Sequence, residues 1–481
     1  MAENYQKKIR DVVNYINTNL IAETPRNIYD PEQGIEQALT PSGKLGKNKN
    51  QFLPITTTLL MLNSFLGNNT LMEGGSGTGK TRLASVAGSL LFQMPYELFE
   101  RKRVVGTPGA TVNEIYATHD LSELNRGNDV AFLYLPFYAP FLMIDELNRF
   151  SELEQNRIRE GIAANTWNYA NHSWIMSGKQ LVVSAVNPES YGGTFILNEN
   201  LLDNYSIVLE PAYFNPLFHD KLVQEAEYRI KKSLGLEEEV DNLMKFYEEH
   251  KNEPKLIRDK IADLQQKTLE AFKERKLPFV HNGDLDKIKD EIGQVKLSPE
   301  GYLFFQSVLA EMTYSKHYGR LRLDDPASDA SHDQKYLSTK IKEALAGRFL
   351  KSWMQTSKAI AWYFNKDQAD VEDVKAAFIY SSNKRIKPEE DFFQEAQNKA
   401  RNIPVNFKVA KNMMKIAWDN YSDFKGKRKE NAAFNKIRKA VRIINGEEKG
   451  TLGDAITELQ KSDHPLAKSV LEAVALNEFY K

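Results

Sequence analysis

The chain has 481 residues, which is too long for a single ordinary core and predicts two to four domains. Its 64 Lys and Arg residues balance 65 Asp and Glu residues, so no overall charge points to nucleic acid or a membrane surface as the partner. The absence of cysteine excludes disulfides, thiolate metal sites and a cysteine nucleophile.

The first 50 residues begin with a helical pattern and then turn polar and loop-like, which predicts an N-terminal helical arm. This arm could dock on a partner or simply pack as a helix, and the sequence does not decide between the two. Residues 1–12 carry charges throughout and lack the apolar core of a signal peptide. The longest apolar run, residues 130–144, is interrupted by Pro136 and Pro140 and is shorter than a bilayer span, so we interpret it as two buried strands. We therefore expect a cytoplasmic protein without a membrane span.

Helical stretches alternate with short apolar runs from residue 51 to residue 212. This alternation predicts a parallel sheet that is covered by helices on both faces. The expected strands are residues 69–72, 141–145, 181–185 and 206–209.

A candidate phosphate-binding loop follows the first of these strands and fits the pattern G-x-x-x-x-G-K-[ST]. Its glycines would let the backbone turn tightly and direct N–H groups into a concavity, and the helix expected over residues 82–92 would add its positive N-terminal end. Lys80 would reach the β- and γ-phosphates of a bound polyphosphate, and the Thr81 hydroxyl would hold Mg²⁺. The alternative is a chance match in a glycine-rich turn, which the register of strand, helix, Lys and Thr disfavours. The candidate nucleotide-binding residues are Gly74, Gly75, Ser76, Gly77, Thr78, Gly79, Lys80, Thr81 and Arg82.

The strand expected at residues 141–145 ends in two acids, Asp145 and Glu146. Parallel sheets bind ligands at the carboxyl ends of their strands. Asp145 would hold Mg²⁺, directly or through water, and Glu146 would orient and activate the water that attacks the γ-phosphate. Acids after an apolar strand are common, but downstream of a complete phosphate loop they indicate a nucleotide site.

The strand expected at residues 181–185 leads to Asn187 and Pro188. Asn187 could hydrogen-bond the γ-phosphate or the attacking water and so report whether the phosphate is present. The alternative is an Asn-Pro turn that only closes the strand, which is the commoner meaning of this dipeptide taken by itself.

These three motifs, in this order, resemble those of the MoxR family of AAA+ ATPases. Residues 145–149 are similar to the family's D-E-[IL]-N-R motif, and residues 187–194 are similar to its N-P-x-E-x-x-G-T stretch with the acid displaced. Further on, Gly347-Arg348 and residues 369–374 are similar to two helix starts in the family's lid domain. The resemblance covers residues 52–212 well and residues 296–388 more loosely.

The resemblance implies an α/β fold, an AAA+ parallel-sheet core with an all-α lid, and helical extensions at both ends. Arg348 would be the lid arginine that contacts the γ-phosphate, and a solvated arginine at a helix start is the alternative. The expected segments are an N-terminal helical arm (1–50), a nucleotide-binding domain (51–212), a helical lid with insertions (213–388) and a basic helical C-terminal domain (389–481).

The resemblance also implies a function. The family forms homo-oligomeric rings, commonly hexamers, that hydrolyse ATP with Mg²⁺ and remodel, assemble or activate other proteins. A partner with a von Willebrand factor A domain often takes part. We therefore expect a chaperone-like ring ATPase with a protein client.

The sequence departs from the family pattern where Asn204 replaces the arginine of the L-D-R-F motif. In the family this arginine reaches the nucleotide of the neighbouring subunit, and such a finger is worth about 10³ to 10⁵ in rate. We expect either slow hydrolysis or another cation, with Arg149, Arg157 and Arg159 as candidates. We favour Arg149, and the alternative is that it only caps or pairs with Glu146.

Two segments with many aromatic residues, 106–137 and 165–179, lack nucleotide chemistry, and the second has the pattern of a strand pair. The resemblance implies that both are loops on the axial face of a ring, where a client is gripped, and the alternative is that their aromatic residues fill the core. Residues 236–272 have helical spacing and predict an inserted helical hairpin.

The C-terminal segment contains a basic stretch, because residues 401–450 carry thirteen Lys or Arg against five Asp or Glu. Together with interleaved aromatic residues it could bind a nucleic-acid backbone, but a solvated helical face is the favoured alternative. Two other functions therefore stay open besides the protein-directed ATPase. One is a nucleic-acid-associated ATPase or motor, and the other is a weakly hydrolysing, nucleotide-gated scaffold.

Overall fold

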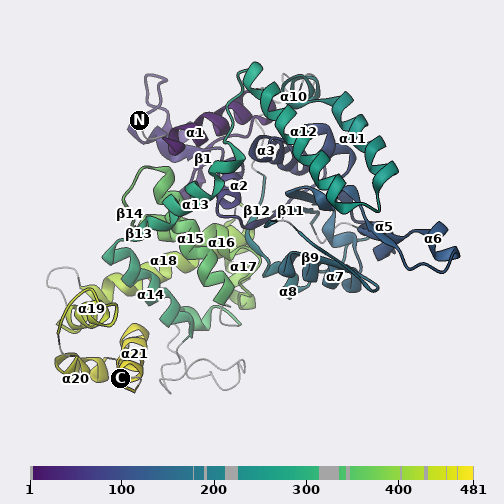
Figure 1. The fold of residues 1–481 in the computed structure, drawn as a ribbon. Coiled ribbons are helices and arrows are strands. Elements are labelled where there is room, and N and C mark those ends of the chain that lie inside the picture. Colours follow the sequence, from purple (N-terminus) through teal and green to yellow (C-terminus); the bar gives the residue numbers. More distant parts are fainter. Residues whose placement is uncertain are drawn as a thin grey trace. The chain divides into compact units, whose positions relative to one another are not determined.

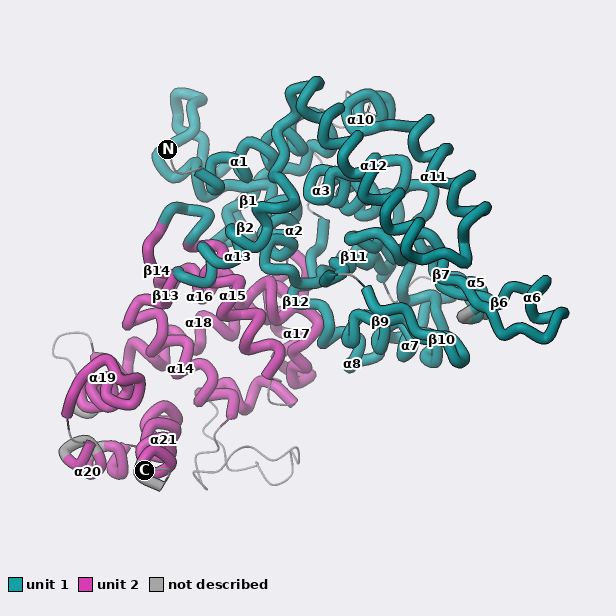
Figure 2. Tube along the Cα trace, viewed as in Figure 1, with its two compact units in different colours: residues 1–294, 362–365 teal, residues 295–361, 366–481 magenta. Residues whose placement is uncertain are grey.

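The computed structural model describes residues 4–176, 178–188, 192–211, 226–313, 335–342, 347–400, 403–426, 432–450, 452–462 and 464–479. The chain forms two compact units (Figure 2). The first comprises residues 1–294 and 362–365, and the second comprises residues 295–361 and 366–481. The boundaries of these two units differ from those of the four segments expected from the sequence, and the division into four segments stays a prediction.

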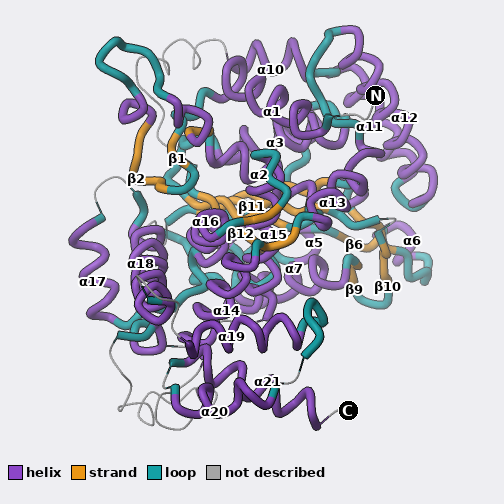
Figure 3. Tube along the Cα trace, turned by 90° about the vertical axis from the view of Figure 1, so that its left-hand side faces the viewer, coloured by secondary structure: helices purple, strands orange, loops and turns teal. Residues whose placement is uncertain are grey.

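A five-stranded parallel sheet forms the centre of the first unit (Figures 1 and 3). Its apolar residues are almost all buried, as in strands that are covered on both faces. The four expected strands are present within one residue of their expected ends, and a short fifth strand at the edge was not expected. In sheet order the strands are β12 (Tyr205–Leu209), β4 (Asn69–Glu73), β11 (Leu181–Val186), β8 (Phe141–Asp145) and β5 (Val104–Val105).

The order of the strands brings the sequence motifs to one edge of the sheet. β11 pairs in parallel with both β4 and β8, so it lies between the strand before the loop and the strand before the acids. Its register aligns Ala185 with Met72 and Ser184 with Ile144. The residues that follow these three strands therefore leave the sheet at the same end.

Helices α2 (Ile55–Phe65) and α3 (Lys80–Phe92) pack against the sheet. Every residue of α2 is buried, the polar Thr, Asn and Ser side chains included. α3 approaches β8 closely because it carries a glycine at the contact. A Cβ atom on Gly88 would lie 2.7 Å from the ring of Phe141.

Four further helices follow the sheet among the described residues of the first unit: α10 (Ala226–Leu234), α11 (Glu237–His250), α12 (Pro254–Glu274) and α13 (Leu285–Gln294). α11 and α12 form the expected helical hairpin. Three glutamates in the first turn of α11 favour its start, because carboxylates stabilise the positive end of a helix. Pro254 at the start of α12 fixes a backbone angle that suits the first turn.

Two antiparallel hairpins extend this unit. One consists of β6 (Ala117–His119) and β7 (Ala131–Leu133), joined by α6 (Leu121–Asn125). The other consists of β9 (Thr166–Tyr169) and β10 (His172–Ile175), which form the expected strand pair after α7 (Glu152–Ala164). The run at residues 130–144 thus contains two strands, β7 and β8, as expected.

The N-terminal region combines helix and strand. α1 (Tyr5–Tyr15) is capped by Asn4 and buries Ile9, Val12 and Val13. It runs into a π-helical segment, Ile16–Ile21. A small antiparallel sheet follows, in the order β2 (Asp30–Gly34), β1 (Arg26–Asn27) and β3 (Phe52–Leu53). The polar stretch that was expected to be a loop therefore contains short strands.

The second unit is almost entirely helical in its described part. Its only described strands, β13 (Lys296–Leu297) and β14 (Gln368–Ala369), pair in parallel. The described helices of this unit are α14 (Pro299–Thr313), α15 (Gly347–Tyr363), α16 (Val371–Ser382), α17 (Glu390–Lys399), α18 (Val405–Lys425), α19 (Ala432–Ile444), α20 (Gly453–Lys461) and α21 (Pro465–Phe479).

No helix in the described part of the chain is long and apolar enough to cross a membrane.

Candidate functional site

The turn between β4 and α3 forms a concave loop. Gly77 and Gly79 have φ angles of +79° and +80°, a left-handed conformation that glycine adopts without strain. Gly74 has little free space, because a Cβ atom there would lie 3.1 Å from Oγ1 of Thr78. α3 begins directly after the loop, so its first N–H groups have no partner within the helix. This turn and the first turn of α3 contain all the predicted nucleotide-binding residues, Gly74, Gly75, Ser76, Gly77, Thr78, Gly79, Lys80, Thr81 and Arg82.

Lys80 points back into this loop. Its Nζ donates to the carbonyl oxygens of Gly74 and Gly75, the latter at 2.8 Å, and lies 3.4 Å from Oδ1 of Asn187. The residue is 6% exposed, and this burial lowers the pKa of its ammonium group. The positive charge is thus held where the loop meets the edge of the sheet.

Thr81 and Asp145 meet across the end of the sheet. The Thr81 hydroxyl donates to Oδ2 of Asp145 at 2.9 Å, and the backbone N–H of Glu146 donates to Oδ1 at 3.0 Å. Arg103, which precedes β5, places its Nε 3.6 Å from the same Oδ2. Arg103 was not predicted as a site residue, because a two-residue strand leaves no periodic pattern by which to place its neighbours.

Glu146 has an unusual backbone. Its φ of +52° is left-handed, which costs a residue with a side chain about 1–2 kcal/mol. The neighbouring backbone holds this conformation, because Gly106 N–H donates to the Asp145 carbonyl and Arg149 N–H donates to the Glu146 carbonyl, both at 2.8 Å. A Cβ atom on residue 106 would lie only 2.1 Å from the Glu146 carbonyl oxygen.

Asn187 connects the loop with the acids. Its Nδ2 donates to Oε1 of Glu146 at 3.2 Å, while its Oδ1 faces the Lys80 ammonium. A second amide holds Asn187 in place: Asn148 Nδ2 donates to the Asn187 carbonyl at 2.8 Å, and the Asn187 N–H lies 3.4 Å from Asn148 Oδ1. Asn148 is 2% exposed. Asn148 was not predicted to have a separate role, although an amide that is buried inside a motif usually needs hydrogen-bond partners and so indicates a positioning role.

The residues Lys80, Thr81, Asp145, Glu146 and Asn187 thus form one contiguous group, which we call the loop-acid cluster. All the members were predicted from the sequence as site residues, and the structure brings them together. A turn that only closed β11 would not require the Asn187 amide to face both Lys80 and Glu146.

The predicted arginines lie in different places. Arg149 pairs with Glu146 at 3.2 Å (Nε to Oε2), which is the arrangement expected if it only pairs with this acid. Arg157 and Arg159 lie on α7, and each pairs with a glutamate of the same helix. Arg348 is exposed in the first turn of α15, in the second unit. A role for any of them at a neighbouring subunit or at the phosphate stays a prediction.

Asn204, which stands where the resemblance places an arginine, lies in the turn before β12. Its Nδ2 donates to the carbonyl of Asn200 at 2.8 Å, and its own carbonyl accepts from Asn69 Nδ2 at 3.2 Å. The side chain of Asn204 therefore stabilises the turn itself, and the backbone carbonyl of Asn204 connects the turn to Asn69 at the start of β4.

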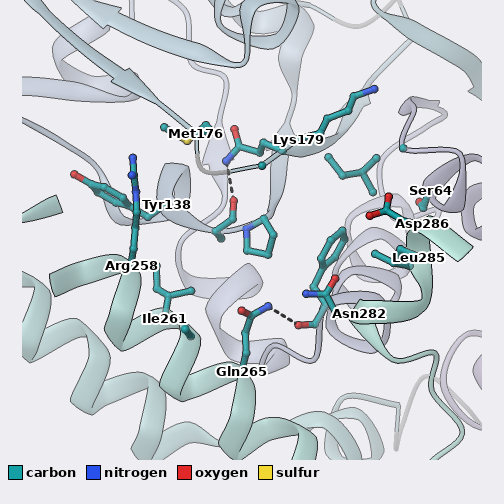
Figure 4. Close-up of a pocket in the computed structure, with 18 of the residues that line it drawn as sticks. Ser64, Tyr138, Met176, Lys179, Arg258, Ile261, Gln265, Asn282, Leu285 and Asp286 are labelled. Atoms are coloured by element: carbon teal, nitrogen blue, oxygen red, sulfur yellow. Dashed lines mark hydrogen bonds between the residues drawn. The ribbon is translucent and has the colours of Figure 1, made fainter. Parts of the chain in front are cut away.

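A cavity of about 460 Å³ lies elsewhere in the first unit, between residues 138–140, Met176 and residues 178–181 on one side and α12 and α13 on the other (Figure 4). Amide groups in its lining are paired with backbone carbonyls: Gln265 Nε2 donates to Phe92 at 2.9 Å, and Gln180 Nε2 donates to Ala139 at 2.8 Å. None of its lining residues belongs to the loop-acid cluster.

No family model and no curated protein matches the chain. The solved structures that match include a crystal structure from Cytophaga hutchinsonii described as a "putative ATPase". The two share 17% identity over 85% of this chain and 94% of that chain, with a TM-score of 0.49. At this identity and TM-score the similarity does not show what this chain does, and the evidence for its function is the geometry of the site.

Proposed function

We propose that this chain is an ATPase of the AAA+ class and, within it, of the MoxR type. The observation that carries the proposal is the continuous set of contacts in the loop-acid cluster. Lys80 meets Asn187, Asn187 meets Glu146, and Thr81 meets Asp145 at one edge of a parallel sheet. A phosphate-loop NTPase needs these groups together, because hydrolysis depends on positioning and on stabilisation of charge.

The residues present fit ATP and Mg²⁺. The Thr81 hydroxyl and the Asp145 carboxylate are hard oxygen donors 2.9 Å apart, and both would hold Mg²⁺. When bound, this ion neutralises charge on the phosphate oxygens. The backbone N–H groups of the loop and the start of α3 would bind phosphate oxygens. Lys80 would exchange its contacts with the Gly74 and Gly75 carbonyls for contacts with the phosphates.

Glu146 is the base in this proposal. Its two carboxylate oxygens face Asn187 and Arg149, which fix its orientation and leave further lone pairs that can accept a hydrogen bond from water. It would orient the attacking water and accept its proton. Asn187 would couple the two halves of the site, because a shift of Lys80 towards a phosphate changes the contact at the Asn187 amide oxygen, whose Nδ2 holds Glu146.

The test combines binding and turnover. A fluorescent ATP analogue with Mg²⁺ measures affinity, and phosphate release measures hydrolysis. Lys80→Ala should lose affinity, whereas Glu146→Gln should keep it and lose about 10²- to 10⁴-fold in turnover. Glu123→Gln, on the exposed helix α6, is the matched control and should leave both unchanged. The proposal fails if the purified chain with Mg²⁺ has no measurable affinity for adenine nucleotides.

The proposal extends to the assembly. In the MoxR manner the chain would act in the cytoplasm as a homo-oligomeric ring, with six subunits as the first expectation. An arginine from a neighbour would complete each site, and Arg348 would sense the nucleotide from the lid. The client would be a protein complex that the ring remodels or activates, with a von Willebrand factor A domain protein as the expected partner. Affinity capture with Glu146→Gln and ATP, which should retain bound client, tests this part.

The described part of the basic stretch, which leaves out residues 401–402 and 427–431, gives the nucleic-acid alternative no support. Its aromatic residues pack inside the second unit: Tyr421 and Phe434 are fully buried, with ring centroids 5.6 Å apart. Lys375 covers the ring of Trp418 at 4.0 Å. Base stacking needs exposed rings, so we keep the protein-directed function. Stimulation of turnover by DNA or RNA, and not by a protein, would reverse this choice.

A further inference from the structure

Two histidines and an aspartate converge between the two hairpins of the first unit. His119 ends β6, Asp129 lies just before β7, and His172 begins β10. Oδ1 of Asp129 lies 3.3 Å from Nδ1 of His119 and 3.1 Å from Nε2 of His172. One potential ligand atom from each of the three residues lies within 4.8 Å of the other two.

These residues come from separate parts of the fold. β6 and β7 form one two-stranded sheet, and β9 and β10 form another. Figure 3 shows the two hairpins next to each other, and the rings of His119 and Tyr169 lie 4.9 Å apart. The three side chains therefore join two pieces of structure that no strand pairing connects in the described residues.

The donor set suits a first-row divalent cation. Imidazole nitrogens together with a carboxylate are typical ligands of Zn²⁺, and three protein ligands with an open position for water are a common arrangement. A tetrahedral ion with bonds of about 2.0–2.1 Å holds its ligand atoms about 3.3 Å apart. The two distances to Asp129 already have this size.

The surroundings support ligation. Oδ2 of Asp129 accepts from Nδ2 of Asn171 at 3.2 Å, which orients the carboxylate as an outer partner of a metal site does. The ring of His172 stacks on Trp174, with centroids 6.0 Å apart. Side-chain exposures of 24% for His119, 26% for His172 and 45% for Asp129 allow an ion to enter from solvent.

We propose that His119, Asp129 and His172 bind one divalent cation of the zinc class, which fastens the β6–β7 hairpin to the β9–β10 hairpin. The site is separate from the loop-acid cluster and does not depend on the proposed ATPase activity. Its effect would be to hold two segments with many aromatic residues in one fixed arrangement.

The experiment titrates the full chain, stripped with a chelator and free of nucleotide, with Co²⁺ and then Zn²⁺ in excess Mg²⁺. We expect one Co²⁺ per chain, with the visible absorption of a low-coordinate cobalt ion, and its displacement by Zn²⁺. Loss of an outer partner costs a metal site about 10- to 100-fold in affinity. Asn171→Ala should therefore weaken binding by about tenfold, and the double variant His119→Ala/His172→Ala by more than about 100-fold.

His250→Ala is the matched control, because His250 also lies beside a carboxylate, that of Glu253 at 2.8 Å, but forms no such group with a second histidine among the described residues. It should bind Co²⁺ as the original chain does. Asp129→Asn keeps both imidazoles and should also weaken binding, with circular dichroism to verify that each variant is folded. The proposal is wrong if the chain binds no stoichiometric metal, or if the double variant and the control bind it equally well.

Discussion

Asn187 has two different neighbours on its one amide group. The oxygen faces the Lys80 ammonium and the nitrogen donates to Glu146, so the side chain links phosphate binding to the base. Asn148 fixes the backbone on which this link depends. The side-chain amides of Asn148 and Asn187 thus fix the arrangement of Lys80 and Glu146 in the middle of the site.

This arrangement predicts the effect of Asn187→Ala. Turnover should fall by about 10²- to 10³-fold, because a preorganised donor is lost, while the affinity for ATP changes much less. Steady-state phosphate release and a nucleotide titration on the same sample separate the two effects. Asn204→Ala, which removes an amide that donates to the Asn200 carbonyl outside the loop-acid cluster, should lower turnover little. Equal rates for Asn187→Ala and the original chain would mean that Asn187 only closes the strand.

The sequence was informative at the residue scale where chemistry demands a residue type. Lys80, Thr81, Asp145 and Glu146 follow from a loop pattern and from acids at a strand end, and they lie together. Arg103 was not predictable, because its contact with Asp145 depends on β5 pairing beside β8. Such a pairing joins segments far apart in the chain and leaves no local pattern.

At the scale of elements, the close contact between α3 and β8 fixes how the loop meets the acids. Gly88→Ala should destabilise the fold by about 1–3 kcal/mol, because the added carbon would overlap the Phe141 ring. Gly293→Ala is the control on α13, where a Cβ atom would meet nothing within 4 Å. It should instead stabilise by about 0.5–1 kcal/mol. Urea unfolding measures both, and a loss for Gly88→Ala no greater than the change at Gly293 would contradict the argument.

Glu311 on α14 predicts a pH dependence for the second unit. Burial raises its pKa from 4.5 to about 8, and Asn420 Nδ2 donates to its Oε2 at 2.9 Å. A carboxyl group whose pKa is raised by folding stabilises the fold fully below its unfolded pKa, and this contribution is lost as pH rises through the folded pKa. Stability should therefore fall between pH 4.5 and pH 8, relative to a variant without this group.

The variant Glu311→Gln keeps the shape and stays neutral. Compared with it, the original chain should lose about 1.4 kcal/mol of unfolding free energy per pH unit inside this window. Denaturant unfolding at several pH values measures the difference. A difference that does not change with pH would show that Glu311 does not titrate there.

The elements divide into those that the sequence revealed and those it did not. Four of the five parallel strands were visible because each is a short apolar run that stops at a polar residue, as at Asp145 and Asn187, whereas the two-residue strand β5 was not. The sequence did not show which parts of the fold the helices α10 to α13 pack against. An amphipathic helix shows that it has a buried face, but the partner of that face is set by contacts distant in sequence.

At the scale of the whole molecule, the proposed ring requires a cation that reaches the site of a neighbouring subunit. We predict that in the assembled state one of Arg149→Ala, Arg157→Ala and Arg159→Ala lowers turnover by about 10³-fold or more. Arg126→Ala, on the tip of the first hairpin, is the control. Sedimentation with and without nucleotide must show that the variants still assemble. Unchanged rates in all three would dismiss these arginines, and a chain that stays monomeric at every concentration would dismiss the ring.

The crowding around the Glu146 carbonyl has a consequence for how the chain tolerates mutation. A saturation library should accept Gln or Asp at position 146 in folded form, since these residues change the carboxylate and leave the backbone as it is. At position 106 it should accept glycine alone, because even a methyl group would come within 2.1 Å of the Glu146 carbonyl oxygen. In a screen for soluble protein, position 106 would therefore tolerate fewer residue types than position 146, although Gly106 has no side chain that takes part in the chemistry.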